Sequence, residues 1–445
     1  MRHEGLPGIA IDTFAQYEER LRRGEQGTLP EAEIEPLTDV PDAGELPDAD
    51  PAALARVVVL KLNGGLGTSM GMTKAKSLLE VKDGHTFLDV IARQVLRLRE
   101  QHEAEIPLLL MNSFATRDDT LAALERYPDL PVEGLPLDFV QGKVPKLLAD
   151  GFEPVSWEAD PALEWAPPGH GDVFTSLATT SLLDTLLERG YEYMFLSNSD
   201  NLGAVLDPRI LAWFAREGLP FMSEVVDRTE ADRKGGHLAR RRDGGGLVLR
   251  ETAQVPDEDQ HAFEDNTRHR FFNANSIWIN LRALRETLDE RDGVLGLPMI
   301  VNKKTVNPTD PSSPEVIQLE TAMGAAIGVF EGAGAIHVPR GRFAPVKTTS
   351  HLLVVRSDAY ELAEDWTVRL VPEREAAPIV ELSSEFKLLA DFEERFPHGA
   401  PSLRGAERLE VDGDVRFGRD VIVRGRVRVE GPAEVPDGSV LEGWS

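Results

Sequence analysis

The sequence contains no cysteine among its 445 residues, which excludes a disulfide scaffold, a thiolate nucleophile and zinc–thiolate sites. No apolar run of about 18 residues occurs, and the first residues lack the apolar core of a signal peptide. Lysine is scarce, with 11 residues against 37 arginines. We therefore expect a cytoplasmic protein that does not cross a membrane, and the positions of its few lysines carry information.

Acidic side chains outnumber basic ones by 76 to 48, so the formal net charge is −28 at pH 7. Such a field repels nucleic acid and anionic membranes, and neither is expected as a partner. Any anionic ligand must be met by a local cluster of positive groups. With 41% hydrophobic and 28% charged residues, the chain can bury a core, and its length suggests two or three domains.

The pattern of residues divides the chain into three parts. Residues 1–50 contain an amphipathic helix and an acidic, proline-rich strap. Residues 51–375 alternate apolar strands with helices, which predicts an α/β domain with a mixed, mostly parallel sheet. Residues 376–445 alternate with period two between 408 and 429 and place glycine at the turns, which predicts a β-solenoid domain without a helix there.

The expected elements follow from hydrophobic periodicity. The expected strands are 56–62, 106–111, 193–197, 221–226, 246–249 and 276–279. The expected helices are 9–21, 86–99, 118–125 and 177–188.

A glycine-rich segment follows the first strand, with the sequence KLNGGLGTSMG over residues 61–71. Ligands of open α/β sheets bind at this edge, and glycines let backbone N–H groups approach a phosphate or a base closely. A dinucleotide fingerprint, and hence an NAD(P) dehydrogenase, is one alternative. That fingerprint requires an acidic ribose ligand about 20 residues further on, whereas Lys74 and Lys76 follow here. A tight turn without a ligand is the other alternative.

Two further loops carry candidate site residues. His170 lies between glycines in WAPPGHGD (165–172), where its ring can face a ligand, although a structural histidine is the simpler alternative. Asp200 lies in SNSDNLG (197–203), directly after a buried strand. A carboxylate there suits Mg²⁺ beside a nucleotide, while an Asx turn is the alternative.

Weaker signals come from DRKGGHL (232–238), RETAQVP (250–256), FNANSIW (272–278) and the basic segment VPRGRFAPVKTT (338–349). Five of the 11 lysines fall in such glycine- or threonine-rich motifs. A compact ammonium charge suits a phosphate, whereas arginine serves the ordinary surface of this chain. These five are Lys61, Lys74, Lys76, Lys234 and Lys347.

Taken together, these segments resemble the eukaryotic-type UTP–glucose-1-phosphate uridylyltransferases, also called UDP-glucose pyrophosphorylases. The resemblance runs nearly from end to end of the chain. The motifs that carry it are 27–31 (GTLPE), 61–71, 112–114 (NSF), 167–172, 197–204, 234–236 (KGG), 317–322 (IQLETA), 340–349, 401–403 (PSL) and 413–415 (GDV).

The resemblance implies a Rossmann-like nucleotidyltransferase domain followed by a short left-handed β-helix. It also implies a role for each matching residue. The uracil and ribose would be approached by Gly64 and Gly65, with Gln141 and Gly169 completing the uracil pocket. The sugar would be faced by His170, Gly236, Glu251 and Asn275, and substrate would also be bound by Leu62 and Asn198. Asp200 would bind Mg²⁺, and the catalytic Lys76 and Lys347 would contact the phosphates.

The implied reaction converts UTP and glucose-1-phosphate into UDP-glucose and pyrophosphate, reversibly, by in-line attack on the α-phosphate with Mg²⁺. Two departures from the family pattern are visible. Ser276 replaces a usual asparagine, which motivates another sugar-1-phosphate (N-acetylglucosamine, galactose or a cyclitol phosphate) as the alternative, and His351 replaces a usual aspartate. A non-catalytic nucleotide-sugar sensor would be expected to lose Asp200, Lys76 or Lys347, and all three are present. The short solenoid leaves the number of subunits open, a homo-oligomer included.

Overall fold

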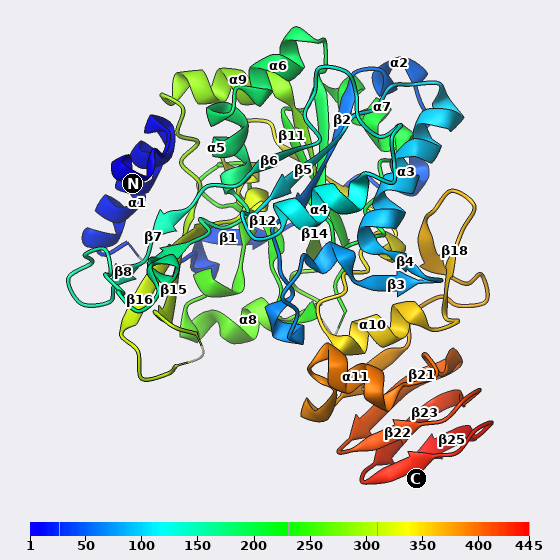
Figure 1. Ribbon diagram of the computed structural model, residues 1–445. Coiled ribbons are helices and arrows are strands. Elements are labelled where there is room, and N and C mark those ends of the chain that lie inside the picture. Colours follow the sequence, from blue (N-terminus) through cyan, green and yellow to red (C-terminus); the bar gives the residue numbers. More distant parts are fainter. Residues whose placement is uncertain (26, 230–231, 309, 445) are drawn as a thin grey trace.

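The computed structural model describes residues 1–25, 27–229, 232–308 and 310–444 (Figure 1). Within these ranges, ten strands form the central sheet. Their bounds are β1 (Ile34–Pro36), β2 (Val57–Asn63), β5 (Leu108–Asn112), β6 (Asp138–Val140), β10 (Tyr193–Asn198), β11 (Phe221–Asp227), β12 (His237–Arg241), β13 (Leu247–Arg250), β14 (Phe271–Asn280) and β17 (Gly334–His337).

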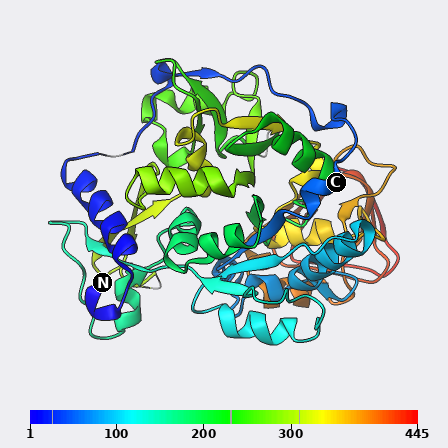
Figure 2. The same ribbon diagram turned by 90° about the horizontal axis from the view of Figure 1, so that it is seen from above.

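The helices and the remaining strands surround this sheet (Figures 1 and 2). The helices are α1 (Gly8–Arg22), α2 (Pro51–Leu54), α3 (Phe87–His102), α4 (Arg117–Leu124), α5 (Asp172–Thr179), α6 (Leu182–Glu188), α7 (Pro208–Glu217), α8 (Gln260–Glu264), α9 (Leu281–Glu290), α10 (Thr349–Arg356) and α11 (Leu389–Arg395). Small sheets are formed by β3 (Glu80–Lys82), β4 (His85–Thr86), β7 (Val144–Pro145), β8 (Leu147–Leu148), β9 (Trp165–Ala166), β15 (Met299–Thr305), β16 (Glu315–Thr321), β18 (Tyr360–Leu362) and β19 (Val368–Leu370).

The central sheet is mixed, as expected for this α/β fold. Its main path runs β1-β12-β14-β10-β2-β5-β6, and the strands from β10 to β6 are parallel. Strand β14 runs antiparallel to both β10 and β11. Because β10, β2 and β5 are parallel neighbours, their carboxyl ends meet at one edge, and the loops that leave them lie together there.

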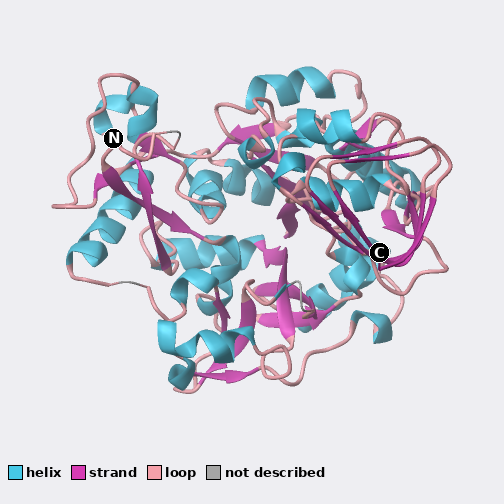
Figure 3. Cartoon of the chain, turned by 90° about the horizontal axis from the view of Figure 1, so that it is seen from below, coloured by secondary structure: helices cyan, strands magenta, loops and turns pink. Residues whose placement is uncertain are grey.

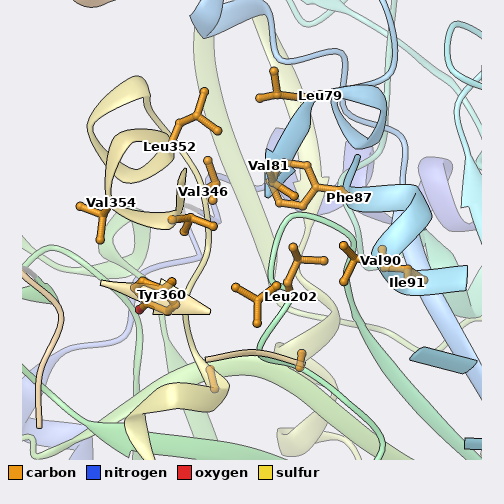
Figure 4. Packing of buried hydrophobic residues seen from close by; sticks show 14 of the residues in the cluster. Leu79, Val81, Phe87, Val90, Ile91, Leu202, Val346, Leu352, Val354 and Tyr360 are labelled. Carbon is orange, nitrogen blue, oxygen red and sulfur yellow. The ribbon is translucent and has the colours of Figure 1, made fainter. Parts of the chain in front are cut away.

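Strand β2 is buried on both faces, which explains its uninterrupted apolar sequence. Successive side chains of a strand point to opposite faces. Val57 and Val59 join a cluster with residues of α3, α7 and α10, whereas Val58 and Leu60 join one with residues of α5, α6 and α9. The helices therefore form one layer on each side of the sheet. Figure 4 shows the first cluster, where Phe87 and Val90 lie near Leu202 and Val346.

The predicted helix over 177–188 is wrong, because two helices occupy this region. Helix α5 ends at Thr179, and α6 begins after Ser181, whose φ of 56° is left-handed. The hydroxyl of Thr180 donates to the carbonyl of Ser176 at 2.7 Å and satisfies the end of α5. Short hydroxyl side chains bond to their own backbone in this way and interrupt a helix that the apolar pattern alone would continue.

The other predicted elements have counterparts in the structure, with ends shifted by a few residues. Helix α3 begins at a capping box, in which Thr86 and Asp89 each accept a backbone N–H from the other. The predicted strand 276–279 is the last part of the longer β14. No helix among the described residues is long and apolar enough to span a bilayer.

The last part of the chain, which also contains α11, forms stacked parallel strands (Figure 3). Strands β20 (Ile379–Leu382), β21 (Ser402–Asp412), β23 (Ile422–Glu430) and β25 (Val440–Trp444) form one sheet, and β22 (Val415–Phe417) pairs with β24 (Ala433–Val435). Leu409 lies opposite Val427, and Val423 lies opposite Leu441, so one coil spans 18 residues in both places. The predicted strand-only pattern over 408–429 is therefore confirmed.

The N-terminal segment packs on the central domain at two places. Tyr17 and Leu21 of α1 are buried against Leu147, Met299 and Ile317 of the small sheet β15-β16-β8.

Further along, Glu31 lies among three basic side chains from distant parts of the chain. Its carboxylate accepts hydrogen bonds from Arg250 at 2.6 Å and Arg268 at 2.6 Å, and lies 3.0 Å from Nε2 of His269. Asp259 also accepts from Arg250, at 3.0 Å. These contacts tie the segment before β1 to the end of β13 and to the residues that precede β14.

Replacing Glu31 with alanine should destabilise the fold. The Arg250 side chain is 0% exposed, and removing one partner of a buried ion pair costs about 3 kcal/mol or more. We expect urea denaturation to show a loss of about 3 kcal/mol in the free energy of unfolding for Glu31→Ala. Glu33→Ala is the matched control, because Glu33 is exposed and lies 3.9 Å from Arg241, and it should cost less than about 1 kcal/mol. Equal free energies of unfolding for the two variants would contradict the stabilising role of the Glu31 contacts.

Candidate active site

The glycine-rich loop leaves β2 at the shared edge of the sheet and approaches Gln141. A Cβ on Gly64 would lie 3.1 Å from Oε1 of Gln141, so this glycine lets the amide pack closely. A Cβ on Gly65 would meet no atom within 4 Å, which leaves its surface open to a ligand. The loop continues into a single 3₁₀ turn over Thr68–Met70 rather than a long helix. The dinucleotide fingerprint, which requires a helix here, is therefore not formed.

The structure brings Lys76 and Asp200 together, although 124 positions separate them in the sequence. Nζ of Lys76 donates to Oδ2 of Asp200 at 2.7 Å, and the two side chains are 15% and 24% exposed. The N–H of Lys76 donates to the carbonyl of Gly65 at 2.9 Å, which holds the lysine beside the glycine loop. A partly exposed ammonium–carboxylate pair thus lies where the carboxyl ends of β2 and β10 meet.

The loop that carries Asp200 is fastened to the basic segment around residue 344. The N–H of Val346 donates to the carbonyl of Asp200 at 3.0 Å. Asn201 holds the same pair of segments: its Oδ1 accepts from the N–H of Ala344 at 3.0 Å, and its Nδ2 donates to the carbonyl of Arg342 at 3.1 Å. We did not single out Asn201 from the sequence. Its only signal was a second amide side chain directly after the aspartate.

Asp200 is a carboxylate at this edge whose surroundings would suit a metal ion. No group of three or more potential His, Cys, Asp or Glu ligands is found among the residues that the structure describes. Mg²⁺ is commonly held by one or two carboxylates together with phosphate oxygens and water. Oδ2 of Asp200 bonds to Lys76, and the residue is partly exposed, so its carboxylate fits a Mg²⁺ ion that the phosphates of a nucleotide also hold.

His170 is held by the backbone on one side of its ring. The N–H of Met323 donates to its Nδ1 at 3.0 Å, which places the ring proton on Nε2. Burial lowers the pKa of His170 to about 4, so the ring is neutral at physiological pH. Nδ1 of His170 therefore has a structural role, because it accepts a backbone N–H, while the Nε2–H is a donor with a fixed direction.

The glycine before His170 allows the close approach of a neighbouring strand. Gly169 has a φ of +80°, and a Cβ there would collide with the carbonyl oxygen of Thr321 on β16. The carboxylate of Asp172 accepts from the N–H of Gly142 at 2.6 Å. Because Gly142 follows Gln141, this bond connects the two loops that are expected to form the uracil pocket.

Glu251 and Gly236 lie against each other. A Cβ on Gly236 would lie 2.6 Å from Oε2 of Glu251. Burial raises the pKa of Glu251, and the nearby Lys347 ammonium opposes that rise. Lys347 itself is exposed. The structure thus brings a glutamate expected at the sugar and a lysine expected at a phosphate into one electrostatic neighbourhood.

The remaining candidates occupy strand positions. Leu62 and Asn198 are register partners at the carboxyl ends of β2 and β10. Asn275 lies on β14 with a φ of 56°, and its N–H donates to Oδ1 of Asn273 at 3.1 Å. Ser276 next to it is fully buried and lies opposite Ser197.

One of the five selected lysines, Lys61, is not placed as the phosphate interpretation requires. Lys61 is 2% exposed, and its Nζ donates to Oγ of Ser197 at 2.7 Å and to the carbonyl of Ala204 at 2.6 Å. Burial lowers the pKa of Lys61 to about 7. Its role is structural, because it connects β2, β10 and the loop after Asp200. Lys234 is exposed, and its backbone carbonyl accepts the hydroxyl of Thr252.

The His170 ring should remain neutral well below pH 6. An NMR titration of the ten histidines should show one imidazole with a pKa of about 4 whose signal disappears in His170→Gln. The unfolded chain takes up this proton near pH 6.5 and the folded chain only near pH 4, so this group's stabilising contribution falls as the pH decreases through that interval. A His170 pKa near 6.5 would contradict the burial of the ring.

Comparison with known proteins shows which family this chain is similar to. The family described as UTP–glucose-1-phosphate uridylyltransferase matches residues 11–424. The uridylyltransferase of Hordeum vulgare is 43% identical over 401 residues, which cover 89% of this chain and 82% of the relative. That of Saccharomyces cerevisiae is 42% identical over 395 residues, covering 87% and 77%.

Solved structures agree with these sequence relatives. A variant of UDP-glucose pyrophosphorylase from Leishmania major, in complex with UDP-glucose, has a TM-score of 0.95 at 44% identity and covers 100% of this chain and 97% of that one. The Trypanosoma brucei structure, described as a UDP-glucose phosphorylase, has a TM-score of 0.93 at 46% identity, covering 99% and 96%. Because both its sequence and its fold match, the chain belongs to the UTP–glucose-1-phosphate uridylyltransferase family.

Proposed function

We propose that the protein transfers the uridylyl group of UTP to glucose-1-phosphate and releases UDP-glucose and pyrophosphate, in a reversible reaction. The observation that carries the proposal is the Lys76–Asp200 pair beside the open surface of Gly65. This pair would supply a cation and a carboxylate for a metal ion next to a glycine-rich loop that would bind the nucleotide. The family membership and the UDP-glucose bound in the Leishmania major relative support the same substrates.

The chemistry requires no general base. An oxygen of the sugar phosphate, which is already anionic, forms a bond to the α-phosphorus of UTP. The bond from that phosphorus to the bridging oxygen breaks, and pyrophosphate leaves with the electron pair. The main barrier is the repulsion between two polyanions in a protein of net charge −28, so positioning and charge stabilisation account for the catalysis.

The side chains divide this work by position. The ammonium of Lys76 lies beside the glycine loop and would contact the α-phosphate, where charge moves during the transfer. Lys347, near Glu251, would orient the attacking sugar phosphate. Mg²⁺ held by Asp200 would supply further positive charge at the phosphates.

The uracil and sugar contacts follow from the loops around this centre. The Gln141 amide, packed on Gly64, would bind the uracil together with Gly65 and Gly169. The Nε2–H of His170 is a donor for the sugar side of the ligand, and the Glu251 carboxylate would accept sugar hydroxyls. The side chain of Ser276 is buried, so this departure from the family pattern gives no support to a different sugar.

Several broader features of the protein are also proposals. We infer that residues 376–445 form a separate domain and wind as a short left-handed β-helix, for which the parallel 18-residue coils are the support. The N-terminal helix and strap over 1–50 and the nucleotidyltransferase domain over 51–375 follow from the sequence pattern. A cytoplasmic location and a homo-oligomer are consistent with the absence of cysteine and with the unpaired outer edge of β25 among the described strands.

Purified protein should release pyrophosphate from UTP only when Mg²⁺ and a sugar-1-phosphate are both supplied. We expect glucose-1-phosphate to give the highest kcat/KM in a panel that also contains galactose, N-acetylglucosamine and cyclitol phosphates, and UTP to exceed ATP, GTP and CTP. EDTA should stop the reaction, and added Mg²⁺ should restore it. Absence of pyrophosphate with every pair of substrates would overturn the proposal, and a higher rate with another sugar would assign that sugar instead.

Removing the Lys76 ammonium should reduce turnover strongly without unfolding the chain. Loss of one preorganised cation at a reacting phosphate costs about 10²- to 10³-fold in kcat. We expect that decrease for Lys76→Ala, with an unchanged circular dichroism spectrum. Lys303→Ala, at an exposed position on β15, is the control and should keep kcat within about twofold. Comparable kcat values for the two variants would remove Lys76 from the mechanism.

A further inference from the structure

Helix α10 begins directly after the catalytic segment that carries Lys347. Thr348 is its N-cap, and the Thr348 Oγ1 lies 3.5 Å from the N–H of His351. The His351 ring bends back over this first turn, so that its Nδ1 lies 3.2 Å from the backbone N of Lys347 and 3.2 Å from Oγ1 of Thr348. Nδ1 of His351 therefore lies within hydrogen-bond distance of two polar groups, which belong to Lys347 and Thr348.

These contacts determine the state of the ring. A backbone N–H can only donate, so Nδ1 of His351 must be the acceptor and carries no proton. The single ring proton is then on Nε2, and the imidazole is neutral. The Thr348 hydroxyl can donate to the same nitrogen and accept the N–H of His351 at the same time.

The ring lies among the charged groups of the proposed reaction. Desolvation of the ring by its neighbours, together with the ammonium groups of Lys347 and Lys76, lowers the pKa of His351, although part of the residue is exposed; Asp200 and Asp232 act in the opposite direction. A carboxylate could accept the same N–H groups at this position. It would, however, add a negative charge beside the two lysines where two polyanions must bind.

We propose that His351 is a positioning residue for the uridylyl transfer, which holds the backbone of Lys347 through Nδ1 and thereby directs the lysine ammonium toward the sugar phosphate. The inference rests on the proposed function. A neutral acceptor fixes the segment without weakening the positive potential that an overall acidic protein must assemble locally. Loss of the acceptor should therefore weaken binding of the sugar phosphate more than binding of UTP.

Two amide substitutions separate the two ring nitrogens. In His351→Asn, the amide oxygen can take the place of Nδ1, whereas in His351→Gln the longer amide reaches the place of Nε2. Loss of one hydrogen bond corresponds to an increase in KM of about three- to tenfold. We expect His351→Gln and His351→Ala to raise the KM for glucose-1-phosphate by that factor, with the KM for UTP within about twofold of wild type. His351→Asn should recover the KM to within about twofold.

A charged substitution tests the electrostatic part. His351→Asp keeps an acceptor and adds a negative charge, so we expect a raised KM for glucose-1-phosphate that approaches the wild-type value as salt is added. His398→Gln is the matched control, because this exposed histidine also has an accepting Nδ1, 3.4 Å from Nε of Arg419, in the C-terminal part of the chain. It should leave both KM values unchanged.

The outcomes distinguish the possible failures. Equal KM values in His351→Gln, His351→Asn and wild type would overturn the positioning role, and so would an equal increase for both substrates. A raised KM in His351→Asn with recovery in His351→Gln would show that Nε2 is the nitrogen in use and would also overturn it. If the wild-type protein itself produced no pyrophosphate, the proposed function would fail, whereas an active enzyme that is insensitive at His351 would overturn only this inference.

Discussion

The parallel pairing of β2 with β10 is the constraint on which the site depends. Both strands are buried at the centre of the sheet, and their register places Leu62 beside Asn198. The glycine loop and the Asp200 loop therefore leave the sheet side by side. Lys76 can reach Asp200 only because this register holds, and a shift by one residue would turn the last side chains of β2 to the opposite face.

Charge is organised locally against the overall composition. Many arginines are committed to ion pairs that hold segments together, such as Arg250 with Glu31 and Arg342 with Glu224. The buried Lys61 serves the same structural purpose, with a pKa lowered to about 7 by its surroundings. In the proposed mechanism, Lys76 and Lys347 supply positive charge for the ligand. A neutral His351 adds a firm contact to Lys347 without adding negative charge.

Much of the fold could be predicted from local sequence patterns, because a buried strand or an amphipathic helix is visible in a run of neighbouring residues. The apolar run before the glycine loop predicted β2, and the periodicity over 86–99 predicted α3. The helix break at Ser181 was not predicted, because hydrophobic periodicity does not reveal a residue with a left-handed backbone conformation. Ordered motifs also indicated most candidate site residues. The link from Asn201 to Ala344 and the burial of Lys61 depend on contacts between distant segments, and no pattern of neighbouring residues encodes them.

The contacts of Glu31 also constrain the order in which parts of the chain can associate during synthesis. Glu31 is made early, but one of its partners, His269, lies 238 positions later in the chain. At a translation rate of about 5–20 residues per second, the carboxylate waits for roughly 10–50 s before its basic partners exist. The segment around Glu31 therefore cannot complete this set of contacts until His269 has been synthesised.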